Sequence, residues 1–528
     1  MKTSSLRIAA VLLVLFLATT GGLASAYDAH PRLVVVIVID QFRGDYLERY
    51  RDQFGEGGFR LFLDHGAYFT DCNYNYANTY TGPGHATLFT GTYSAGHGIM
   101  ANEWWDPQKQ RMVTSVEDDT TTLVGSASPQ PGASPHNLLS ETLGDVLKLS
   151  TQGKSRVFSI SLKDRAAILP GGFSADGVYW VDPNTGNWIT STYYRAALPP
   201  WVQDINSRLQ KEVATGKDST GKALPGKSPR ELAATPAAND EEFNLARELI
   251  VQEHLGSGPA TDLMAISLSA NDILGHRVGP DAPEMQAMAL AMDKQLADFF
   301  AFLGRQIGLA NIWIALSADH GVAALPSVAS KLRIPAANMD DARLRAQIND
   351  SLTTKFSPGH RAEYVAEVDY PVAWLNDSAF AGVHVREQEA EQAVGDALLA
   401  AGLRSYFTRT QLARGEAPNT PFGHKFLNSY SPHGGWYVIG VPPPYYVGSP
   451  SGTSHGTPYS YDTHVPLALY GVPFQPGTYR AHSEPVDLAV TLASLLGINA
   501  PSHAVGRVLT EALADRASRP RTATGGAR

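Results

Sequence analysis

Three short segments of this chain are almost entirely apolar: residues 33–39 (LVVVIVI), 263–268 (LMAISL) and 312–316 (IWIAL). A strand that is covered on both faces has this composition, because neither face turns a side chain toward water. Between the last two segments, apolar residues recur three and four positions apart, which predicts a helix. These residues are Met285, Met288, Met292, Leu296, Phe299 and Leu303. Strand, helix and strand in succession favour parallel pairing, so we expect an α/β fold with a largely parallel central sheet flanked by helices.

Two further segments support this alternation of helices and strands. Before the strand-like segment 157–162, one helical face is formed by Leu139, Leu143, Val146 and Leu147. Near the carboxyl end, Pro485 is placed to open a helix, because proline is well tolerated in a first helical turn. The apolar residues of this second predicted helix are Leu488, Leu492 and Leu496.

Two stretches interrupt the pattern. Residues 197–240 are rich in Pro, Lys and Ala, and residues 325–450 have mixed periodicity and contain three consecutive prolines. We interpret both as insertions that form a cap on a single catalytic domain, residues 27–515. The tail, residues 516–528, has no apolar period and is expected to be disordered.

The first 26 residues have the organisation of a secretory signal peptide. Lys2 and Arg7 precede the apolar segment 8–18, and small residues at 24–26 come before Tyr27. The alternative is a membrane anchor, but this apolar segment has 11 residues, whereas a spanning helix needs about 20. We therefore expect cleavage after Ala26, a periplasmic or secreted protein, and no stable membrane anchor.

The composition limits the partners and cofactors of the chain. Lys and Arg total 42 against 51 Asp and Glu, so no net positive charge would draw the protein to nucleic acid. The single cysteine, Cys72, excludes an internal disulfide and a cysteine-based zinc cluster. A metal ion would therefore be bound by histidine and carboxylate side chains.

Side chains that bind metals follow each of the three apolar strands. They are Asp40 after the first strand, Asp272 and His276 after the second, and Asp319 and His320 after the third. Open α/β sheets bind ligands at the carboxyl ends of their strands. Each residue alone is more often a helix cap or a structural histidine, but their coincidence at three strand ends favours a metal centre. His455, in a glycine-flanked loop, would complete the ligand set.

Thr81 is the candidate nucleophile. It precedes Gly82 and Pro83 at a predicted helix start, where free backbone N–H groups and the positive end of the helix dipole favour an anion. The ordinary alternative is a threonine helix cap. A threonine hydroxyl is a poor nucleophile unless a metal ion lowers its pKa, so this role depends on the metal centre.

Taken in order along the chain, these motifs resemble those of the alkaline phosphatase superfamily, and more narrowly its PafA-type periplasmic alkaline phosphatases, which have a single threonine nucleophile. The resemblance extends from about residue 31 to about residue 509. It rests on Asp40, Thr81-x-x-Gly84-His85, residues 98–102 (GIMAN), residues 161–165 (SLKDR), Asp272-x-x-x-His276, residues 319–321 (DHG) and His455-Gly456.

The resemblance implies a zinc-dependent phosphomonoesterase with two zinc ions per chain, about 4 Å apart. It implies that Asp272, His276 and His455 hold one ion, and that Asp40, Thr81, Asp319 and His320 hold the other. It also implies that Asn102, Lys163 and Arg165 contact the phosphoryl oxygens. Small-molecule phosphate monoesters would be the substrates and inorganic phosphate the product.

Charge supports a monoester substrate. Two Zn²⁺ ions with three aspartates leave one net positive charge, and Lys163 and Arg165 add two more, which suits a dianion. The alternative for residues 163–165 is a solvated charged turn, but these residues directly follow a predicted strand. His464 competes with His455 as the last ligand; we prefer His455, because His464 adjoins a strand-like segment.

Several other functions are alternatives to a phosphomonoesterase. A phosphodiesterase or nucleotide pyrophosphatase of the same superfamily also uses threonine and the same ligands, although Lys163 and Arg165 favour monoesters. A sulfatase needs Cys or Ser in a C/S-x-P-x-R setting, and residues 73–75 after Cys72 are NYN. A cofactor-independent phosphoglycerate mutase would have serine at position 81. Outside the hydrolases, the alternative is a non-catalytic exported zinc-binding protein.

Overall fold

The structure is a computed structural model that describes residues 30–126, 130–218, 220–226 and 228–514. The predicted signal peptide, residues 1–26, and the predicted disordered tail, residues 516–528, lie outside the described residues. Within the described part of the chain, no helix is both long and apolar enough to cross a membrane.

A ten-stranded sheet forms the centre of the fold, in the order β18-β2-β17-β10-β1-β9-β6-β7-β8-β5. Its middle is parallel and consists of β10 (Ile312–Ser317), β1 (Leu33–Ile39), β9 (Asp262–Leu268), β6 (Val157–Ser161) and β7 (Gly177–Val181). Val35 of β1 pairs with Ile314 on one side and Met264 on the other, so the three apolar segments are adjacent strands. All residues of these three strands are buried, as their sequences predict.

Antiparallel strands flank this parallel centre. On one side, β17 (His464–Tyr470) pairs antiparallel with both β10 and β2 (Ala67–Asn73), and β18 (Gly477–Tyr479) closes the edge. On the other side, β8 (Trp188–Ser191) and β5 (Leu123–Val124) are each antiparallel to their inner neighbour. The predicted α/β fold is confirmed, but the sheet as a whole is mixed: antiparallel pairs flank the parallel centre, and β18 pairs parallel with β2 at one edge.

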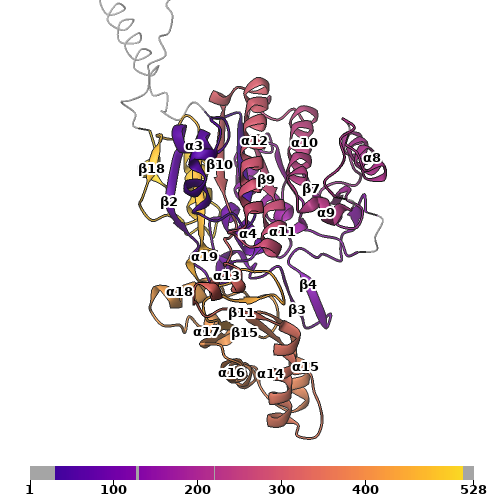
Figure 1. The fold of residues 1–528 in the computed structure, drawn as a ribbon, viewed down its shortest axis with the longest axis vertical. Coiled ribbons are helices and arrows are strands. Elements are labelled where there is room, and N and C mark those ends of the chain that lie inside the picture. Colours follow the sequence, from indigo (N-terminus) through magenta and orange to yellow (C-terminus); the bar gives the residue numbers. More distant parts are fainter. Residues whose placement is uncertain (1–29, 127–129, 219, 227, 515–528) are drawn as a thin grey trace, which may run out of the picture.

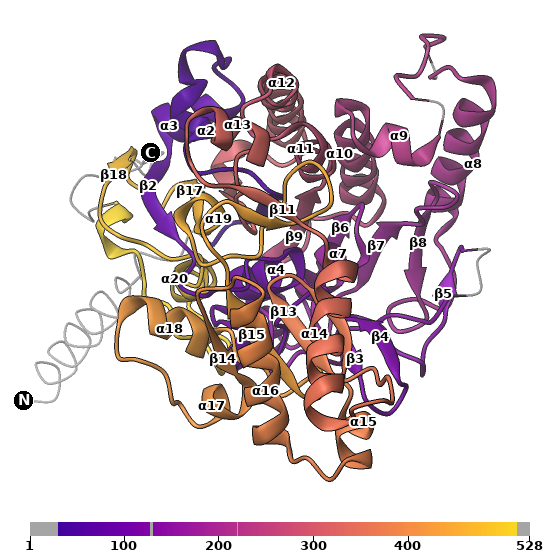
Figure 2. The ribbon, with the colours of Figure 1, turned by 60° about the horizontal axis from the view of Figure 1, so that its bottom comes forward.

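Helices cover both faces of this sheet (Figures 1 and 2). The predicted helix between β9 and β10 is α12 (Pro283–Gln306), and its predicted apolar residues are all buried. The predicted helix before β6 is shorter than its pattern suggested: α6 (Leu143–Ser150) begins after Thr142, whose side chain forms a capping box with Asp145. Leu139 therefore precedes the helix and is 44% exposed. The carboxyl-terminal helix is α20 (Asp487–Leu495).

Residues 197–240 contain α8 (Pro200–Thr215), α9 (Pro229–Ala233) and the start of α10 (Pro236–Gln252). In Figure 2, α8 and α9 lie at the side of the sheet where β7 and β8 are.

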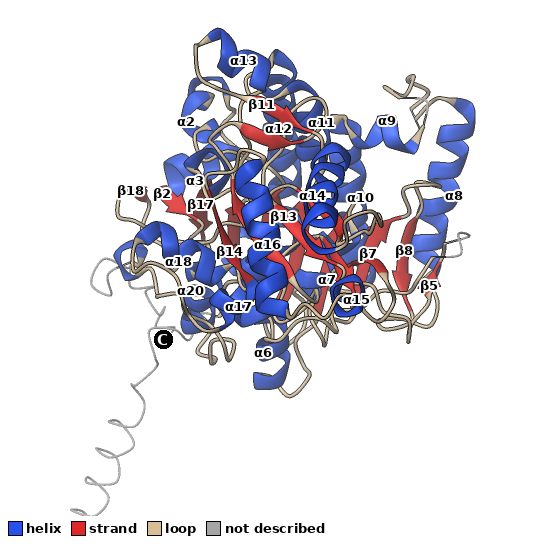
Figure 3. Ribbon diagram, turned by 90° about the horizontal axis from the view of Figure 1, so that it is seen from below, coloured by secondary structure: helices blue, strands red, loops and turns tan. Residues whose placement is uncertain are grey.

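Residues 325–450 contain a second, antiparallel sheet of four strands, β12-β13-β15-β14. Its elements are β12 (Val365–Asp369), β13 (Val372–Leu375), β14 (Ser405–Thr408), β15 (Tyr437–Val441), α14 (Asp341–Phe356) and α16 (Glu387–Ala400). They enclose an apolar core of their own, which includes Leu344, Val394 and Leu398. This second unit projects from one end of the molecule in Figure 1, and Figure 3 shows it from that end, with α14 and α16 in front of the central sheet.

The shorter elements connect these parts. They are α2 (Tyr46–Arg49), α3 (Phe59–His65), α5 (Ser94–His97), β3 (Glu103–Asp106), β4 (Arg111–Thr114), α13 (Pro326–Lys331), β11 (Ala337–Met339), α15 (Asp377–Gly382), α17 (Arg409–Ala413), α18 (Pro421–Asn428), β16 (Tyr446–Gly448) and α19 (Ser460–Thr463). Three further helices begin near the carboxyl ends of the parallel strands: α4 (Thr81–Thr90), α7 (Asp164–Gly171) and α11 (Ala270–Val278).

Candidate active site

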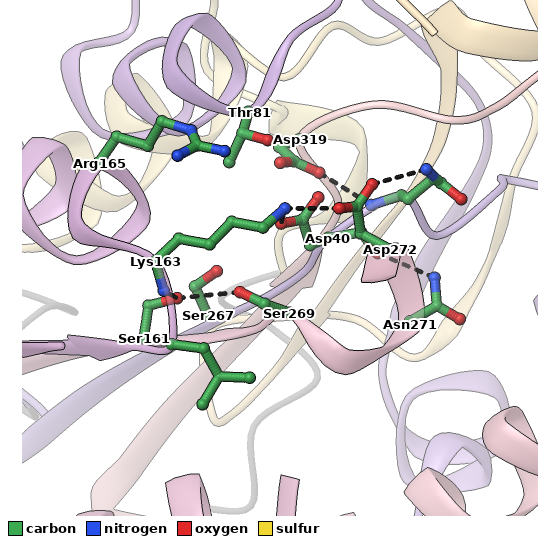
Figure 4. Close-up of polar contacts among 12 residues, drawn as sticks. Asp40, Thr81, Ser161, Lys163, Arg165, Ser267, Ser269, Asn271, Asp272 and Asp319 are labelled. Atoms are coloured by element: carbon green, nitrogen blue, oxygen red, sulfur yellow. Dashed lines mark hydrogen bonds and ion pairs between the residues drawn. The ribbon is translucent and has the colours of Figure 1, made fainter. Parts of the chain in front are cut away.

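The predicted site residues converge at the carboxyl ends of the parallel strands. Asp40 directly follows β1, Asp272 lies in the first turn of α11 after β9, and Asp319 follows β10. Lys163 follows β6 as the N-cap of α7, and Thr81 is the first residue of α4. Figure 4 shows these side chains facing a common centre. Topology explains the convergence, because parallel strands end at the same edge of a sheet.

Two groups of potential metal ligands lie side by side at this centre. Asp272, His276 and His455 form the first group, and Asp40, Asp319 and His320 form the second; within each group the ligand atoms lie within 4.8 Å of one another. In the first group, Oδ1 of Asp272 is 3.1 Å from Nε2 of His276 and 3.8 Å from Nε2 of His455.

In the second group, Nε2 of His320 is 3.5 Å from Oδ1 of Asp40 and 3.5 Å from Oδ2 of Asp319. The rings of His320 and His455 stack, with their centroids 3.6 Å apart, and so connect the two groups. All three residues of the second group are completely buried.

A hydrogen bond from Nδ1, the ring nitrogen that does not face the carboxylates, orients each of the three histidines. Nδ1–H donates to the backbone carbonyl of Thr453 in His276 (2.9 Å), of Gly321 in His320 (2.9 Å) and of Thr79 in His455 (2.7 Å). Nε2 is then the nitrogen that faces the carboxylates in all three rings. Metal-binding histidines have this arrangement, because the outer hydrogen bond fixes the ring and its tautomer.

The donor set fits divalent metal ions. Among the described residues, Oδ1 of Asp40, Oδ2 of Asp319 and Nε2 of His320 are buried polar atoms without a hydrogen-bond partner. Such atoms are costly in a protein interior unless another partner is bound. Imidazole nitrogens with carboxylate oxygens are the ligands that zinc prefers when thiolates are absent.

The pKa values of the site residues reflect both their burial and the close approach of three carboxylates. Burial raises the pKa of Asp40 well above its usual value, and the charges of Asp272 and Asp319 raise it further. Burial also opposes ionisation of Asp272, but His276 and Lys163 outweigh it and hold its pKa well below the usual value. Burial lowers the pKa of His455, so its imidazole is neutral, the form that binds metals.

Lys163 stands between the two groups. Its Nζ donates to Oδ2 of Asp40 and to Oδ2 of Asp272, at 2.6 Å in each case (Figure 4). Burial opposes the ammonium charge, but the two carboxylates outweigh it and raise the pKa of Lys163. A permanent positive charge therefore borders both groups, next to the position where an anionic substrate would be bound.

Arg165 and Asn102 offer further hydrogen-bond donors. Nε of Arg165 is buried and has no hydrogen-bond partner among the described residues, and Figure 4 shows its guanidinium beside Thr81. Oδ1 of Asn102 accepts from the backbone N–H of Gly82 at 2.8 Å. This bond occupies the carbonyl end of the amide, so the NH₂ end is left to donate.

Thr81 lies at the amino end of α4 and is buried. Figure 4 places its side chain between the guanidinium of Arg165 and the carboxylate of Asp319. A hydroxyl in this position has a carboxylate ligand candidate on one side and a cation on the other. Tyr80, the preceding residue, donates from its hydroxyl to the carbonyl of Tyr370 (3.4 Å), so the second unit contacts this part of the site directly.

The structure distinguishes between the two histidines that the sequence offers as the last metal ligand. His455 belongs to the first group. Nε2 of His464 is instead 2.9 Å from the backbone oxygen of Thr70, and His464 begins β17. The site also includes a histidine to which no role was assigned from the sequence: Nδ1 of His85 is 3.3 Å from Oδ2 of Asp319.

Two further residues of the site were missed. Gln41 donates from its backbone N–H to Oδ1 of Asp319 (3.1 Å) and from Nε2 to Oδ1 of Asp272 (2.6 Å). Glu242 on α10 is completely buried and accepts from the backbone N–H of Leu162, beside Lys163, at 3.0 Å. The position of Gln41 directly after Asp40 was a usable signal, whereas nothing in the local sequence marks Glu242.

Comparisons with known proteins agree with this geometry. The family model of type I phosphodiesterase / nucleotide pyrophosphatase matches residues 34–414. Alkaline phosphatase PhoV of Synechococcus elongatus is 32% identical over 92% of this chain and 93% of its own. Alkaline phosphatase PafA of Elizabethkingia meningoseptica is 31% identical over 92% of this chain and 94% of its own. A protein of Myroides odoratus named calcium-transporting ATPase is 32% identical over 93% of this chain and 96% of its own.

Solved structures give the same result. Wild-type alkaline phosphatase PafA has a TM-score of 0.83 and 30% identity, over 92% of this chain and 99% of that chain. Murine ectonucleotide pyrophosphatase / phosphodiesterase 5, at 16% identity over 91% of this chain and 100% of its own, has a TM-score of 0.53 and shares the fold. The chain therefore belongs to the type I phosphodiesterase / nucleotide pyrophosphatase family and, within the alkaline phosphatase superfamily, to the PafA-type alkaline phosphatases.

Proposed function

We propose that this protein is an exported, zinc-dependent alkaline phosphatase that hydrolyses phosphate monoesters through a phosphothreonine at Thr81. The observation that carries the proposal is the pair of neighbouring ligand groups, in which three histidines direct Nε2 toward carboxylates and are fixed by backbone carbonyls. Asp272, His276 and His455 would hold one zinc ion, and Asp40, Asp319 and His320, with Thr81, the other.

The bound zinc ions would supply Lewis acidity, which lowers the pKa of hydroxyl groups and offsets charge on the reacting oxygens. The Thr81 hydroxyl releases its proton to solvent and attacks phosphorus; an Oγ–P bond forms while the bond from phosphorus to the ester oxygen breaks, and the ester oxygen takes up a proton from solvent as the alcohol departs. Water then attacks the phosphothreonine, the Oγ–P bond breaks, and inorganic phosphate leaves. Lys163, Arg165 and Asn102 would hold the phosphoryl oxygens through both steps.

Two observations support these roles. Lys163 and Arg165 place two positive charges beside the ligand groups, and a monoester dianion gains more from them than a monoanionic diester does. In addition, a solved alkaline phosphatase PafA variant carries substitutions at a threonine, an asparagine, a lysine and an arginine. The same four residue types occur here in the same order, as Thr81, Asn102, Lys163 and Arg165.

The second candidate is a phosphodiesterase, which the name of the matching family model favours. One assay separates the two: initial rates with p-nitrophenyl phosphate and with bis-p-nitrophenyl phosphate at alkaline pH. We expect the monoester to have the larger kcat/KM. A larger value for the diester would make the diesterase the leading function, and no turnover of either would point to a non-catalytic zinc-binding protein.

Export has its own test. The proposal expects a mature chain that begins at Tyr27, in the periplasm or outside the cell. Mass spectrometry of the amino-terminal peptide from the periplasmic and cytoplasmic fractions would measure this, and an intact residue 1–26 segment on the active protein would contradict it.

A further inference from the structure

An apolar cavity of about 400 Å³ lies beside the site. Its wall brings together the turn after β6, the end of β7 and parts of α8, α9, α10 and α11. Figure 2 shows β7, α8 and α9 at one side of the sheet. Six apolar side chains in the wall are only half-buried: Leu162, Val181, Leu209, Val213, Leu232 and Ile273. A volume of this size is in the range of small-molecule sites, and half-buried apolar walls gain free energy when a ligand covers them.

Two residues of the wall connect the cavity to the reacting centre. Lys163 lines the cavity, and its Nζ lies 2.6 Å from both Asp40 and Asp272. Ile273 is the neighbour of Asp272 on α11, the helix that also carries His276. The cavity is therefore connected to the first ligand group through Lys163 and Ile273, whereas the ligand residues themselves and Thr81 do not belong to its wall.

The direction of attack by Thr81 places the leaving group on the side of the first ligand group, to which the cavity is connected. In a displacement at phosphorus, the attacking and leaving oxygens lie roughly in line on opposite sides. Figure 4 shows Thr81 beside Asp319 of the second group. An attack from Thr81 consequently drives the ester oxygen away from the second group and toward the first, which contains Asp272, the neighbour of the wall residue Ile273.

We propose that this cavity binds the hydrocarbon part of the substrate's leaving alcohol, so that the enzyme prefers phosphate monoesters of apolar alcohols. This inference rests on the proposed monoesterase. The binding free energy comes from the burial of apolar surface. Cations hold the phosphoryl group, while the alkyl or aryl group of the same ester leaves water and covers the apolar wall. The cavity then sets leaving-group preference without contacting phosphorus.

The test compares n-hexyl phosphate with ethyl phosphate, whose alcohols are similar as leaving groups. We expect kcat/KM for the hexyl ester to be larger by about tenfold or more. Val213→Trp fills the cavity and Leu232→Asp adds a charge to its wall; each should remove most of this ratio and leave ethyl phosphate hydrolysis unchanged. Retained ethyl phosphate hydrolysis shows that each variant is folded.

Leu149→Trp is the matched control. Leu149 belongs to a second, mostly apolar hollow formed by α6 and Phe173, which contains none of the catalytic residues, so this variant should keep the hexyl preference. Equal kcat/KM values for both esters, or a preference that survives Val213→Trp and Leu232→Asp, would overturn the inference and leave the monoesterase standing.

Binding gives a readout that does not depend on turnover. Hexylphosphonate should bind about tenfold more tightly than ethylphosphonate, measured as an inhibition constant or, by calorimetry, as a dissociation constant. Val213→Trp should remove the difference. If neither ester is hydrolysed, the proposed function fails, and the phosphonate comparison still decides whether the cavity takes an alkyl group. Equal affinities would overturn the inference.

Discussion

The side-chain amide of Gln41 donates a 2.6 Å hydrogen bond to Oδ1 of Asp272. Gln41 has a φ of 63°, in the left-handed region that non-glycine residues avoid at a cost of about 1 kcal/mol. This conformation also allows its backbone N–H to donate to Asp319. One residue thereby orients a carboxylate in each ligand group, which gives a physical reason for the strained backbone.

Gln41→Gly relieves the backbone conformation but removes the bond to Asp272. We expect a loss of about 10- to 100-fold in kcat/KM or metal affinity, because outer-sphere partners orient metal ligands. Chelator competition and steady-state kinetics measure this. Gln110→Gly is the matched control, since Gln110 also has a positive φ of 51° but is exposed in the turn between β3 and β4. Equal activity in both variants would rule out the role of Gln41.

Lys163→Ala and Arg165→Ala should each lower monoesterase activity much more than diesterase activity, because a diester lacks one of the anionic oxygens that these residues would contact. The expected cost is on the order of 2–4 kcal/mol of transition-state stabilisation, as for one lost oxyanion donor. Rates with p-nitrophenyl phosphate and its bis ester give the comparison. Lys148→Ala is the control, because Lys148 forms a half-buried ion pair with Asp176 and contacts none of the candidate site residues. Equal losses on both substrates would instead indicate a general positioning role.

Thr81 should carry phosphate during turnover. Mass spectrometry of acid-quenched enzyme should find phosphothreonine at position 81, and a chiral phosphate should show net retention, because two displacements occur. Thr81→Ser keeps a hydroxyl and measurable activity, whereas Thr81→Ala loses most activity and stays folded. Thr90→Ala, in the same helix α4, removes only a hydrogen bond to the Ala86 carbonyl and should remain active. An unmodified Thr81 with inverted stereochemistry would mean direct attack by water.

Stability should depend on pH through Glu391, which is completely buried on α16. Burial raises its pKa to about 7, and the charge of Glu387 adds to the shift. The folded pKa lies above the unfolded value of about 4.3, so the native state holds more protons between these values and stability falls as pH rises from about 4 to 7. Glu391→Gln should remove this loss, on the order of 3 kcal/mol above pH 7. Urea unfolding at pH 5 and pH 8 measures it; the same pH dependence in both proteins would contradict the assignment.

Sequence patterns predicted the centre of the fold because its strands are buried on both faces. The almost wholly apolar segments 33–39 and 312–316 predict buried strands, and the polar residues that follow them are expected to meet at one edge of the sheet. The antiparallel entry of β17 beside β10 could not be predicted, since pairing direction is set by distant contacts. The second sheet could not be predicted either, because its strands are short and its two faces pack against two different apolar clusters.

The candidate site divides in the same way. Residues with metal-ligand chemistry at strand ends, such as Asp40 and Asp319, could be found from their position alone. Glu242 could not, because it reaches the site from the middle of α10, where one glutamate looks like any other. The role of His85 beside Asp319 could not be predicted either, because a single histidine inside a helix does not indicate which residue it faces.

Metal content tests the central claim most directly. Protein purified without chelators should contain two zinc ions per chain by mass spectrometric metal analysis, and Asp272→Ala and Asp319→Ala should each lose metal and activity together. Asp293→Ala is the control, because this buried carboxylate accepts from backbone N–H groups of Gly55 and Phe59 away from the site; its folded fraction should keep both ions. A fully active enzyme with no zinc, or with a single zinc ion per chain, would contradict the account.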